Sequence, residues 1–556
     1  MSALSYVRGA SAPPLIEKCI GESLQDAAWR WPDTPALISV HQNVRMTWRE
    51  LKSAVDEVAL GLLALGVGPG DRVAIWAPNC AEWVLTQFAT ASIGVVLVNM
   101  NPAYRQSEAA FTLRKTGAKA LIVASQVKSS NYVELVEGLA PELFAEPSSA
   151  TGELPDLAFV VKIGGEPRSR WIDFAELAER GRTVDAHRLR EIASGLSPHD
   201  PVNIQFTSGT TGTPKGATLS HHNILNNGYF VGAAIGLSPG ERVCIPVPLY
   251  HCFGMVMGNL ACLTHGATMV YPSATYDPLA VLSAIESERC AAIYGVPTMF
   301  IAELQHPRFA EFDLSSLRTG IMAGSPCPVE VMRQVVERMH VRDVTISYGM
   351  TETSPVSFQS APDDPLARRV ETVGRVMPHL ECKIVDADGA TTLLGQAGEL
   401  CTRGYSVMLG YWNEPEATRA VLDADGWMRS GDLAVLDEDG YCRIVGRIKD
   451  MIIRGGENVY PREIEEFLYG HPDIEDVSVV GVPDPSMGEE VCAWIVPRAG
   501  VVLTEADVRG YCVGRIAHYK TPRHIRFVMG FPLTATGKVR KFEIRQAMQA
   551  EFEAAR

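Results

Sequence analysis

The sequence predicts an α/β fold in which a large N-terminal domain with several subdomains precedes a smaller α+β C-terminal domain. Between about 200 and 360, short apolar runs end repeatedly in small polar loops and alternate with helical stretches. This rhythm is typical of α/β layers with ligand loops at the strand ends. From about 380 to 446 the pattern changes to hairpins, which predict a small β subdomain. A fresh strand–loop–strand pattern after about 448 predicts the second domain.

The composition argues against several classes of protein. At 556 residues the chain exceeds what one hydrophobic core usually supports. Its formal net charge of −15 argues against nucleic acid as a partner, because affinity for phosphate backbones rests on an excess of Lys and Arg. No stretch reaches about 18 uninterrupted apolar residues, so no transmembrane helix is expected. Twelve cysteines without a CxxC pair or a zinc spacing, and the lack of a signal peptide, favour a cytoplasmic protein with reduced thiols.

Two features mark the first part of the chain. The stretch TWRE at 47–50 is a capping-box pattern that predicts an amphipathic helix running to about Leu65. The stretch GVGPGDRVAIWAPN then leads through a Gly/Pro turn into a buried strand. Its glycines resemble a dinucleotide-binding loop, but they precede the strand instead of following it. A plain turn is therefore favoured.

The stretch FTSGTTGTPKG at 206–216 is either a solvated linker or a phosphate-binding loop. Gly/Ser/Thr tracts are usually linkers. This loop, however, follows a predicted strand at 202–206, and its small residues let backbone N–H groups approach an anion near Lys215. The P-loop pattern G-x-x-x-x-G-K-[ST] fails, since Pro214 precedes the lysine and Gly216 follows it. The loop is expected to bind phosphate without being an ordinary P-loop.

Further along, three stretches each predict a strand that ends in a loop: AAIYGVPTMF, TGIMAGSPCP and VTISYGMTETS. They are interleaved with predicted helices such as 329–339. In the C-terminal part, Pro461 suits the first turn of a helix that runs to about Tyr469.

Five motifs occur in the order found in the adenylate-forming acyl-CoA synthetase superfamily: TSGTTGTPKG, YGMTETS, SGDLA, GRIKDMIIRGGENVYP and PLTATGKVRK. The resemblance runs from about Leu24 to Met548. PLYHCFG, AGSPCP and KDMIIRGGENVYPREIEEFL make the chain most similar to medium-chain fatty acyl-CoA synthetases. The resemblance implies an ATP- and Mg²⁺-dependent enzyme that forms acyl-AMP and pyrophosphate, and then acyl-CoA and AMP with CoA as co-substrate.

The resemblance also implies the roles of individual residues in nucleotide binding. The expected ATP- and AMP-binding residues are Thr207, Ser208, Gly209, Thr210, Thr211, Gly212, Lys215, Gly324, Ser325, Tyr348, Gly349, Thr351, Asp432, Arg447 and Lys538. The expected catalytic residues are Lys538, Thr351, Glu352 and Lys215, and Glu352 is also the expected metal ligand.

The chemistry of these residue types agrees with the implied roles. Mg²⁺ prefers hard oxygen ligands and bridges phosphates, which suits Glu352. Asp432 can accept hydrogen bonds from both ribose hydroxyls, as acidic residues do in other nucleotide sites. Lys538 is expected to reach the reacting carboxylate and the α-phosphate, where charge develops during adenylation.

The expected acyl-binding residues are His251, Phe253, Met255, Met257 and Ala323. A general-base role for His251 is unfavourable, because the attacking carboxylate has no proton to lose at neutral pH. A wall or gate between acyl group and nucleotide is preferred, with a structural histidine as the alternative. Some similar enzymes place a gating tryptophan four residues after this histidine, where this chain has Met255. The flexible methionines suit an alkyl chain but equally suit a core.

Cys252 and Cys327 lack a partnered His and Asn or Asp, so structural thiols are favoured over a nucleophile. The resemblance implies that Arg454, Gly455 and Gly456 face CoA, because glycine lets pantetheine approach closely. It also implies a hinge at Lys449, which divides the chain into an adenylation domain, 1–448, and a mobile domain, 449–556.

Several functions stay open from the sequence. A medium-chain fatty acid–CoA ligase is the leading hypothesis, with branched or aromatic acids as alternative substrates. A second alternative is a ligase that loads a carrier-protein thiol. A catalytically inactive nucleotide- or acyl-binding regulator is the third, although the retained site residues argue against it. Dimers are common among similar enzymes, so a homodimer is an open expectation.

Overall fold

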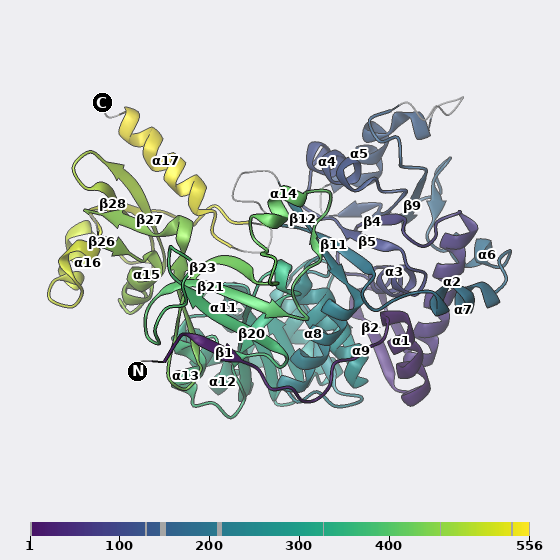
Figure 1. The fold of residues 1–556 in the computed structure, drawn as a ribbon, viewed down its shortest axis with the longest axis horizontal. Coiled ribbons are helices and arrows are strands. Elements are labelled where there is room, and N and C mark those ends of the chain that lie inside the picture. Colours follow the sequence, from purple (N-terminus) through teal and green to yellow (C-terminus); the bar gives the residue numbers. More distant parts are fainter. Residues whose placement is uncertain are drawn as a thin grey trace.

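The computed structural model describes residues 3–127, 130–144, 152–207, 214–325, 327–455, 457–534 and 538–554. Figure 1 shows a large body, which holds three large sheets and a two-stranded one of β7 (Gln126–Val127) and β8 (Ser130–Asn131), and a smaller unit beside it that ends in helix α17 (Lys541–Ala554). The predicted fold class, α/β with a large N-terminal and a small C-terminal domain, is confirmed.

The first sheet has eight strands in the order β10-β9-β6-β4-β5-β11-β12-β22. Neighbouring strands from β10 to β11 are parallel, whereas β12 and β22 are antiparallel additions. The strands are β4 (Arg72–Trp76), β5 (Val96–Asn99), β6 (Ala120–Ala124), β9 (Phe159–Ile163), β10 (Ile172–Asp173), β11 (Pro201–Thr207), β12 (Lys215–Ser220) and β22 (Gly410–Tyr411). Helices α1 (Ile20–Arg30), α2 (Trp48–Ala64), α3 (Ala81–Ser92), α4 (Gln106–Thr116), α5 (Tyr132–Leu139), α6 (Glu176–Gly181) and α7 (His187–Ser194) belong to this part of the chain.

Two predictions for this region are confirmed. The Thr47 hydroxyl accepts a hydrogen bond from the Glu50 N–H, and the Glu50 carboxylate accepts one from the Thr47 N–H, so the capping box opens α2. The glycines of GVGPGD form a turn before β4, in which Gly66 and Gly70 have φ values of +79° and +81°. Only glycine adopts such backbone angles without strain. Because the stretch lies between α2 and the start of β4, and not after a strand, it is a turn and not a dinucleotide-binding loop.

The second sheet has nine strands in the order β19-β18-β17-β16-β15-β13-β14-β2-β3. Its strands are β2 (Pro35–Ser39), β3 (Val44–Thr47), β13 (Arg242–Cys244), β14 (Thr268–Tyr271), β15 (Ala292–Gly295), β16 (Thr319–Ala323), β17 (Asp343–Gly349), β18 (Val356–Gln359) and β19 (Arg375–Val376). The helices between them are α8 (His221–Ala234), α9 (Ala261–His265), α10 (Pro278–Glu288), α11 (Pro297–Leu304), α12 (Val329–Arg338) and α13 (Leu366–Glu371). The three predicted strand-to-loop units are β15, β16 and β17, and the helix predicted at 329–339 is α12.

The third sheet is the predicted small β subdomain, an antiparallel sheet in the order β1-β20-β21-β23-β24. Its strands are β1 (Tyr6–Arg8), β20 (Leu380–Val385), β21 (Gly398–Gly404), β23 (Met428–Leu436) and β24 (Cys442–Arg447). The short helix α14 (Pro415–Arg419) lies between β22 and β23 in the chain.

A fourth sheet and its helices form the smaller unit in Figure 1. The sheet contains β25 (Ile452–Arg454), β26 (Glu457–Val459), β27 (Ile474–Asp484), β28 (Gly488–Pro497) and β29 (His524–Phe527). Helix α15 spans Pro461–Tyr469, as predicted from Pro461, and α16 spans Glu505–Cys512. This unit has its own hydrophobic core, which includes Ile464, Val479 and Ile495.

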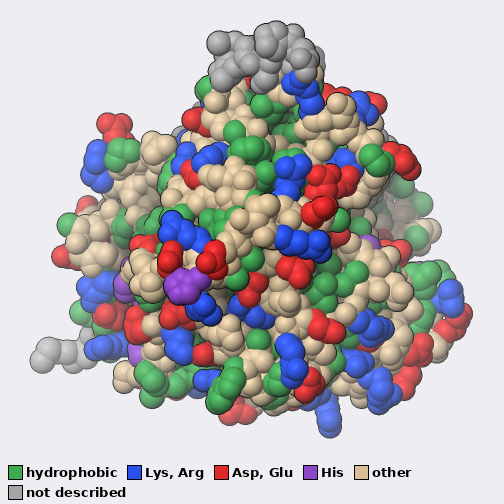
Figure 2. Space-filling view, turned by 90° about the vertical axis from the view of Figure 1, so that its right-hand side faces the viewer, with side chains coloured by type: hydrophobic (Ala, Val, Ile, Leu, Met, Phe, Trp, Pro, Cys, Tyr) green, Lys and Arg blue, Asp and Glu red, His purple; other side chains and the backbone are tan. Residues whose placement is uncertain are grey.

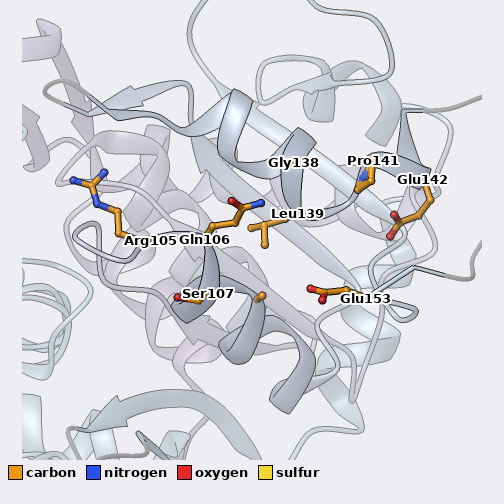
Figure 3. A pocket seen from close by; sticks show the side chains of 9 residues that line it. Arg105, Gln106, Ser107, Gly138, Leu139, Pro141, Glu142 and Glu153 are labelled. Atoms are coloured by element: carbon orange, nitrogen blue, oxygen red, sulfur yellow. The ribbon is translucent and has the colours of Figure 1, made fainter.

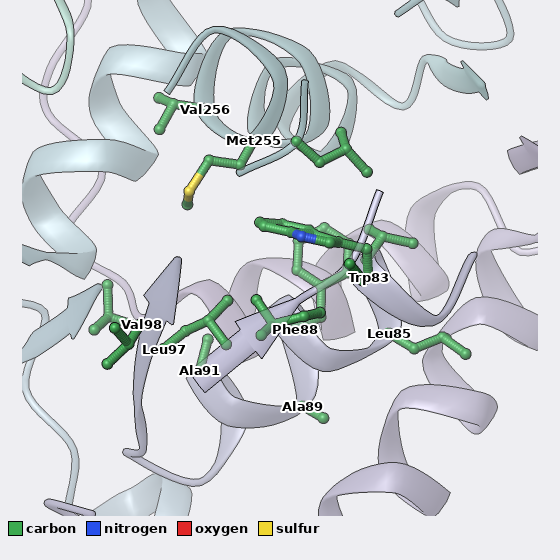
Figure 4. Packing of buried hydrophobic residues seen from close by; sticks show 14 of the residues in the cluster. Trp83, Leu85, Phe88, Ala89, Ala91, Leu97, Val98, Met255 and Val256 are labelled. Carbon is green, nitrogen blue, oxygen red and sulfur yellow. The ribbon is translucent and has the colours of Figure 1, made fainter. Parts of the chain in front are cut away.

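The largest core joins the first and second sheets. Figure 4 shows Trp83 and Phe88 of α3 and Val98 of β5 beside Met255, which lies in a π-helix spanning Phe253–Leu260. All of these side chains are buried. π-Helical turns are rare and recur at functional sites. The π-helix contains three of the predicted acyl-binding residues, Phe253, Met255 and Met257.

Charges of both signs are mixed on the surface. On the face shown in Figure 2, Lys and Arg side chains alternate with Asp and Glu. In the described part of the chain, none of the helices combines the length and the apolar character that crossing a membrane requires.

Glu303 of α11 is a buried carboxyl group with a consequence for stability. It is 1% exposed, its Oε1 accepts a 3.4 Å hydrogen bond from Tyr276, and its Oε2 lacks a hydrogen-bond partner among the described residues. Burial raises the pKa of Glu303 to about 8. The pKa of Glu303 in the folded state is higher than its unfolded value of about 4.3. The contribution of protonated Glu303 to the free energy of unfolding is therefore fully present below about pH 4.3, and it is lost as the pH rises through about 8.

We therefore expect the free energy of unfolding to fall between about pH 5 and pH 8 by on the order of a few kcal/mol. Glu303→Gln should flatten this decline, which denaturant unfolding at several pH values measures. Glu288 is a matched control, because it is also buried but is paired with Arg45, which lowers its pKa. Glu288→Gln should lower stability across this range without changing its slope. A Glu303→Gln profile parallel to that of the wild type would contradict the prediction.

Candidate active site

The phosphate-loop motif lies between two paired strands. β11 ends at Thr207 and β12 begins at Lys215, and these two residues are opposite each other in the register. The predicted strand at 202–206 is therefore confirmed as the support of the loop. The expected phosphate-binding residues Ser208, Gly209, Thr210, Thr211 and Gly212 lie outside the described residues. The Lys215 ammonium lies over the Tyr411 ring, 5.1 Å from its centre.

Glu352 lies in a 3-10 turn, Thr351–Thr353, directly after β17. Its side chain is 6% exposed, and Oε1 accepts hydrogen bonds from Thr207 (3.3 Å) and Tyr411 (2.9 Å). At Gly349, a Cβ atom would lie 1.7 Å from the Pro355 carbonyl oxygen, so only glycine fits where β17 leads into this turn.

Asp432 joins the second and third sheets. Its Oδ2 accepts a 2.6 Å hydrogen bond from the Tyr348 hydroxyl, and its Oδ1 lies 2.9 Å from Arg447 Nε. Asp432 and Arg447 are register partners on β23 and β24, and Tyr348 is on β17. Asp432 is 5% exposed, and the two donors hold its carboxylate in one orientation.

Lys538 reaches the same place from the C-terminal unit. Lys538 is exposed to solvent, but the protein atoms around its ammonium group displace part of the water there. This loss of hydration lowers the pKa of the ammonium group, and the charge of Arg447 lowers it as well. Asp432 and Glu352 shift the Lys538 pKa in the opposite direction. These charges act on Lys538 only because the side chains lie close together. The structure thus places Lys538 within electrostatic range of both carboxylates, without an ion pair to either of them among the described residues.

His251 also lies near this group. Burial, together with the charge of Lys538, lowers the pKa of His251 to about 4. The ring is therefore neutral at neutral pH. It accepts a 3.4 Å hydrogen bond from the Phe253 N–H at Nδ1.

The other expected acyl-binding residues are packed in the protein interior. Phe253 stacks on Tyr294, with ring centres 5.8 Å apart, and Ala323 is buried at the end of β16. Met255 Sδ accepts hydrogen bonds from the side chains of Asn99 and Gln205, both at 3.1 Å. These contacts suit a core position as well as a channel wall, so the acyl-binding role stays a prediction.

Arg454 and Gly455 are placed elsewhere. Arg454 forms two hydrogen bonds with the buried Glu490, and the Gly455 N–H donates to the Met487 carbonyl. These contacts stay within the C-terminal unit, whereas Lys538 of the same unit is within electrostatic range of Asp432. Gly456 lies outside the described residues. Lys449 follows β24 in a 3-10 turn, where burial and the charge of Arg447 lower its pKa.

Gly324, Ser325 and the two site cysteines complete the predicted set. Gly324 has a φ of +90°, and with Ser325 it follows directly on β16, whose neighbour in the sheet is β17. Burial raises the pKa of Cys327 to about 12 and that of Cys252 well above its usual range. Both thiols are therefore protonated at neutral pH, which agrees with structural cysteines.

The donor set fits a magnesium ion that arrives with ATP. In the described part of the chain, no cluster of three or more His, Cys, Asp or Glu side chains could hold a metal alone. Mg²⁺ in nucleotide sites usually has one or two carboxylate ligands, with phosphates and water as the others. The Glu352 carboxylate forms no ion pair with a described Lys, Arg or His, and both its hydrogen bonds go to Oε1.

Sequence reasoning missed Tyr411, which contacts both Lys215 and Glu352. It lies in the two-residue strand β22, at the edge of the first sheet. The only signal was an aromatic pair, GYW, shortly before the proline that starts α14.

An open cavity of about 690 Å³ lies elsewhere, between α4 and α5 (Figure 3). It is lined by Arg105, Gln106, Ser107, Ala110, Gly138, Leu139, Pro141, Glu142 and Glu153. None of the predicted site residues lines this cavity, so it is separate from the candidate active site.

Comparison with known proteins identifies the family. The AMP-binding enzyme profile matches residues 24–412, and the profile of the AMP-binding enzyme C-terminal domain matches residues 463–538. The chain belongs to the AMP-binding enzyme family.

Relatives of this AMP-binding enzyme align over nearly its whole length. A putative acyl-CoA synthetase, YngI, of Bacillus subtilis is 48% identical over 96% of this chain and 97% of its own. The mitochondrial medium-chain acyl-CoA ligase ACSF2 of Danio rerio is 47% identical over 99% of this chain and 91% of its own. The crystal structure of the anthranilate CoA ligase AuaEII with anthranoyl-AMP is 28% identical, has a TM-score of 0.83 and covers 97% of this chain and 98% of its own.

Proposed function

We propose that the protein is an ATP- and Mg²⁺-dependent medium-chain fatty acid–CoA ligase. In the first half-reaction a carboxylate oxygen of the acid attacks the α-phosphorus of ATP, and pyrophosphate leaves. In the second, the thiol sulfur of CoA attacks the carbonyl carbon of acyl-AMP, and AMP leaves. The observation that carries the proposal is the convergence of the two carboxylates, Asp432 held by Tyr348 and Arg447 and Glu352 held by Thr207 and Tyr411, with Lys538 of the C-terminal unit within electrostatic range of both. The two named relatives above support the acyl substrate.

Separate groups of residues would bind the ribose and the phosphates of ATP. Asp432, fixed by Tyr348 and Arg447, would accept hydrogen bonds from the ribose hydroxyls. Thr207 and Lys215 stand at the two ends of the loop that would hold the β- and γ-phosphates through N–H and hydroxyl donors. Glu352 would hold Mg²⁺, which neutralises phosphate charge when bound.

Lys538 would stabilise the charge that builds up as the two anions react. A fixed cation lowers the barrier most where charge increases towards the transition state. His251 takes no proton in this step, because the attacking group is already a carboxylate and the ring is neutral. It would instead separate the acyl group from the nucleotide.

The second half-reaction would need the other face of the C-terminal unit. We propose the division into 1–448 and 449–556, with rotation about Lys449 that replaces Lys538 by Arg454, Gly455 and Gly456. The support is that Lys538 is near Asp432 here, while Arg454 and Gly455 bond only within their own sheet in the contacts described above.

Pyrophosphate release with a panel of acids, with and without CoA, tests the proposal. Release with C6 to C12 fatty acids and CoA-dependent formation of acyl-CoA is the expected result. Release without use of CoA would indicate a carrier-protein thiol as acceptor. A preference for aromatic acids would favour the alternative that the anthranilate ligase exemplifies. No release with any acid would indicate a nucleotide- or acyl-binding regulator.

The assignment of the acyl channel can be tested at Met257, which is buried in the π-helix. Met257→Trp should shift preference towards shorter acids, because the larger ring would shorten a tunnel that Met257 lines. The measurement is kcat/KM across straight-chain acids of increasing length. A uniform loss at all lengths would mark Met257 as a core residue, since overpacking affects every substrate alike.

For the compartment, we propose the cytoplasm. All twelve cysteines are buried and free, which agrees with reducing conditions.

A further inference from the structure

We propose that Tyr411 is a positioning residue for adenylation, which holds the Glu352 carboxylate in the orientation that binds Mg·ATP. The inference rests on the proposed function, because it takes Glu352 as the group that meets the metal.

The backbone around Tyr411 is fixed to the strand that leaves the phosphate loop. β22 pairs with β12, so that Tyr411 is opposite Ala217. The Trp412 N–H donates to the Gly216 carbonyl at 2.7 Å, and the Leu409 N–H donates to the Thr218 carbonyl at 2.9 Å. The tyrosine is thus attached to the same strand that begins with Lys215.

The same segment is fixed to the turn that carries Glu352. The Met408 N–H donates to the Glu352 carbonyl at 2.9 Å, and the Ser354 hydroxyl donates to the Ser406 carbonyl at 2.6 Å. The Tyr411 hydroxyl then donates to Glu352 Oε1 at 2.9 Å. Residues 406–412 therefore connect the phosphate-loop strand with the turn that holds the carboxylate.

A glutamate needs such a partner to present its oxygens in one orientation. The terminal torsion of a Glu side chain is broad and weakly restricted. Tyr411 and Thr207 both bond Oε1, which fixes this torsion and directs Oε2 away from the two hydroxyls. The Tyr411 ring also lies beneath the Lys215 ammonium, a cation–π contact. One buried side chain thus contacts an anion and a cation that are expected to meet the ATP phosphates.

The test compares ATP binding with Mg²⁺ and with EDTA by titration calorimetry. Tyr411→Phe keeps the ring below Lys215 and removes only the hydroxyl. We expect it to weaken binding of Mg·ATP by about tenfold, because a hydrogen bond to a charged group is lost. Binding of metal-free ATP should stay unchanged. A loss that depends on the metal distinguishes positioning of Glu352 from a general structural role.

Tyr405 provides the matched control. It is 8% exposed, like Tyr411, and its hydroxyl accepts a 3.4 Å hydrogen bond from the Asn227 side chain. Tyr405→Phe should bind both forms of ATP as the wild type does. Thermal unfolding of each variant verifies that it is folded.

A second experiment places Tyr411→Phe in the Glu352→Gln background, where it should cause no further loss, since residues that act through one another are not additive. The proposal is overturned if Tyr411→Phe binds Mg·ATP like the wild type, if the loss persists in EDTA, or if it persists in the Glu352→Gln background. Failure of the proposed function has a different signature: the wild-type protein itself releases no pyrophosphate with any acid, and the role of Tyr411 in adenylation falls with it.

Discussion

Replacing Lys538 with alanine is expected to suppress acyl-AMP formation by about 10²–10³-fold, while CoA still attacks supplied acyl-AMP at nearly the normal rate. The reason is that the ammonium group lies within electrostatic range of Asp432 and Glu352, where ATP is proposed to react, and that the proposed rotation removes it before the second half-reaction. Pyrophosphate release measures adenylation, and acyl-CoA formation from synthetic acyl-AMP measures thioester formation.

Arg540 is the control for this experiment, because it is a cation on the same C-terminal segment. Its guanidinium forms an exposed pair with Glu543 three residues away, and such surface pairs contribute little. Arg540→Ala should leave both half-reactions unchanged. If Lys538→Ala slowed both half-reactions equally, this result would contradict the proposal that the C-terminal unit adopts a different arrangement for each half-reaction.

Replacing Asp432 with alanine is expected to raise the KM for ATP strongly. The variant loses a hydrogen-bonding carboxylate, which suggests roughly 1.5–3 kcal/mol, or about ten- to more than a hundredfold in affinity. It also leaves Arg447 and Lys538 without the negative charge that both of them interact with. Steady-state kinetics with ATP as the varied substrate checks the prediction.

The chain contains a close structural match for Asp432 outside the site. Asp364 is 7% exposed, accepts a hydrogen bond from Tyr441 and lies 3.7 Å from Arg375. Asp364→Ala should lower stability as much as Asp432→Ala does but leave the KM for ATP unchanged. An unchanged KM in Asp432→Ala would remove the ribose assignment.

The sequence predicted best what depends on local patterns. The capping box at Thr47, the turn before β4 and the helix that starts at Pro461 all follow from a few neighbouring residues. The strand-to-loop units were found for the same reason, since apolar runs that end in small polar residues need no distant contact to be recognised. The mixed α/β character follows from their alternation.

Contacts between distant residues could not be predicted from these patterns. Lys538 comes within electrostatic range of Asp432 through the packing of two units, and only the family resemblance suggested that Lys538 belongs to the site. The hydrogen bond from Tyr411 to Glu352 joins residues 59 positions apart through a two-residue strand, which is too short to leave a periodic signal. For Met255, hydrophobicity alone does not separate a channel wall from a core, and its two hydrogen bonds became visible only in the structure.

The short strand β1 has a consequence for how the protein is made. Tyr6 pairs with Lys383 and Arg8 pairs with Glu381, so a strand from the N-terminal part of the chain completes the edge of the sheet that carries Asp432 (Figure 1). During synthesis these first residues leave the ribosome long before their partners exist. They must stay unpaired until β20 has been translated, and the third sheet then acquires its edge strand β1 as a late event in folding.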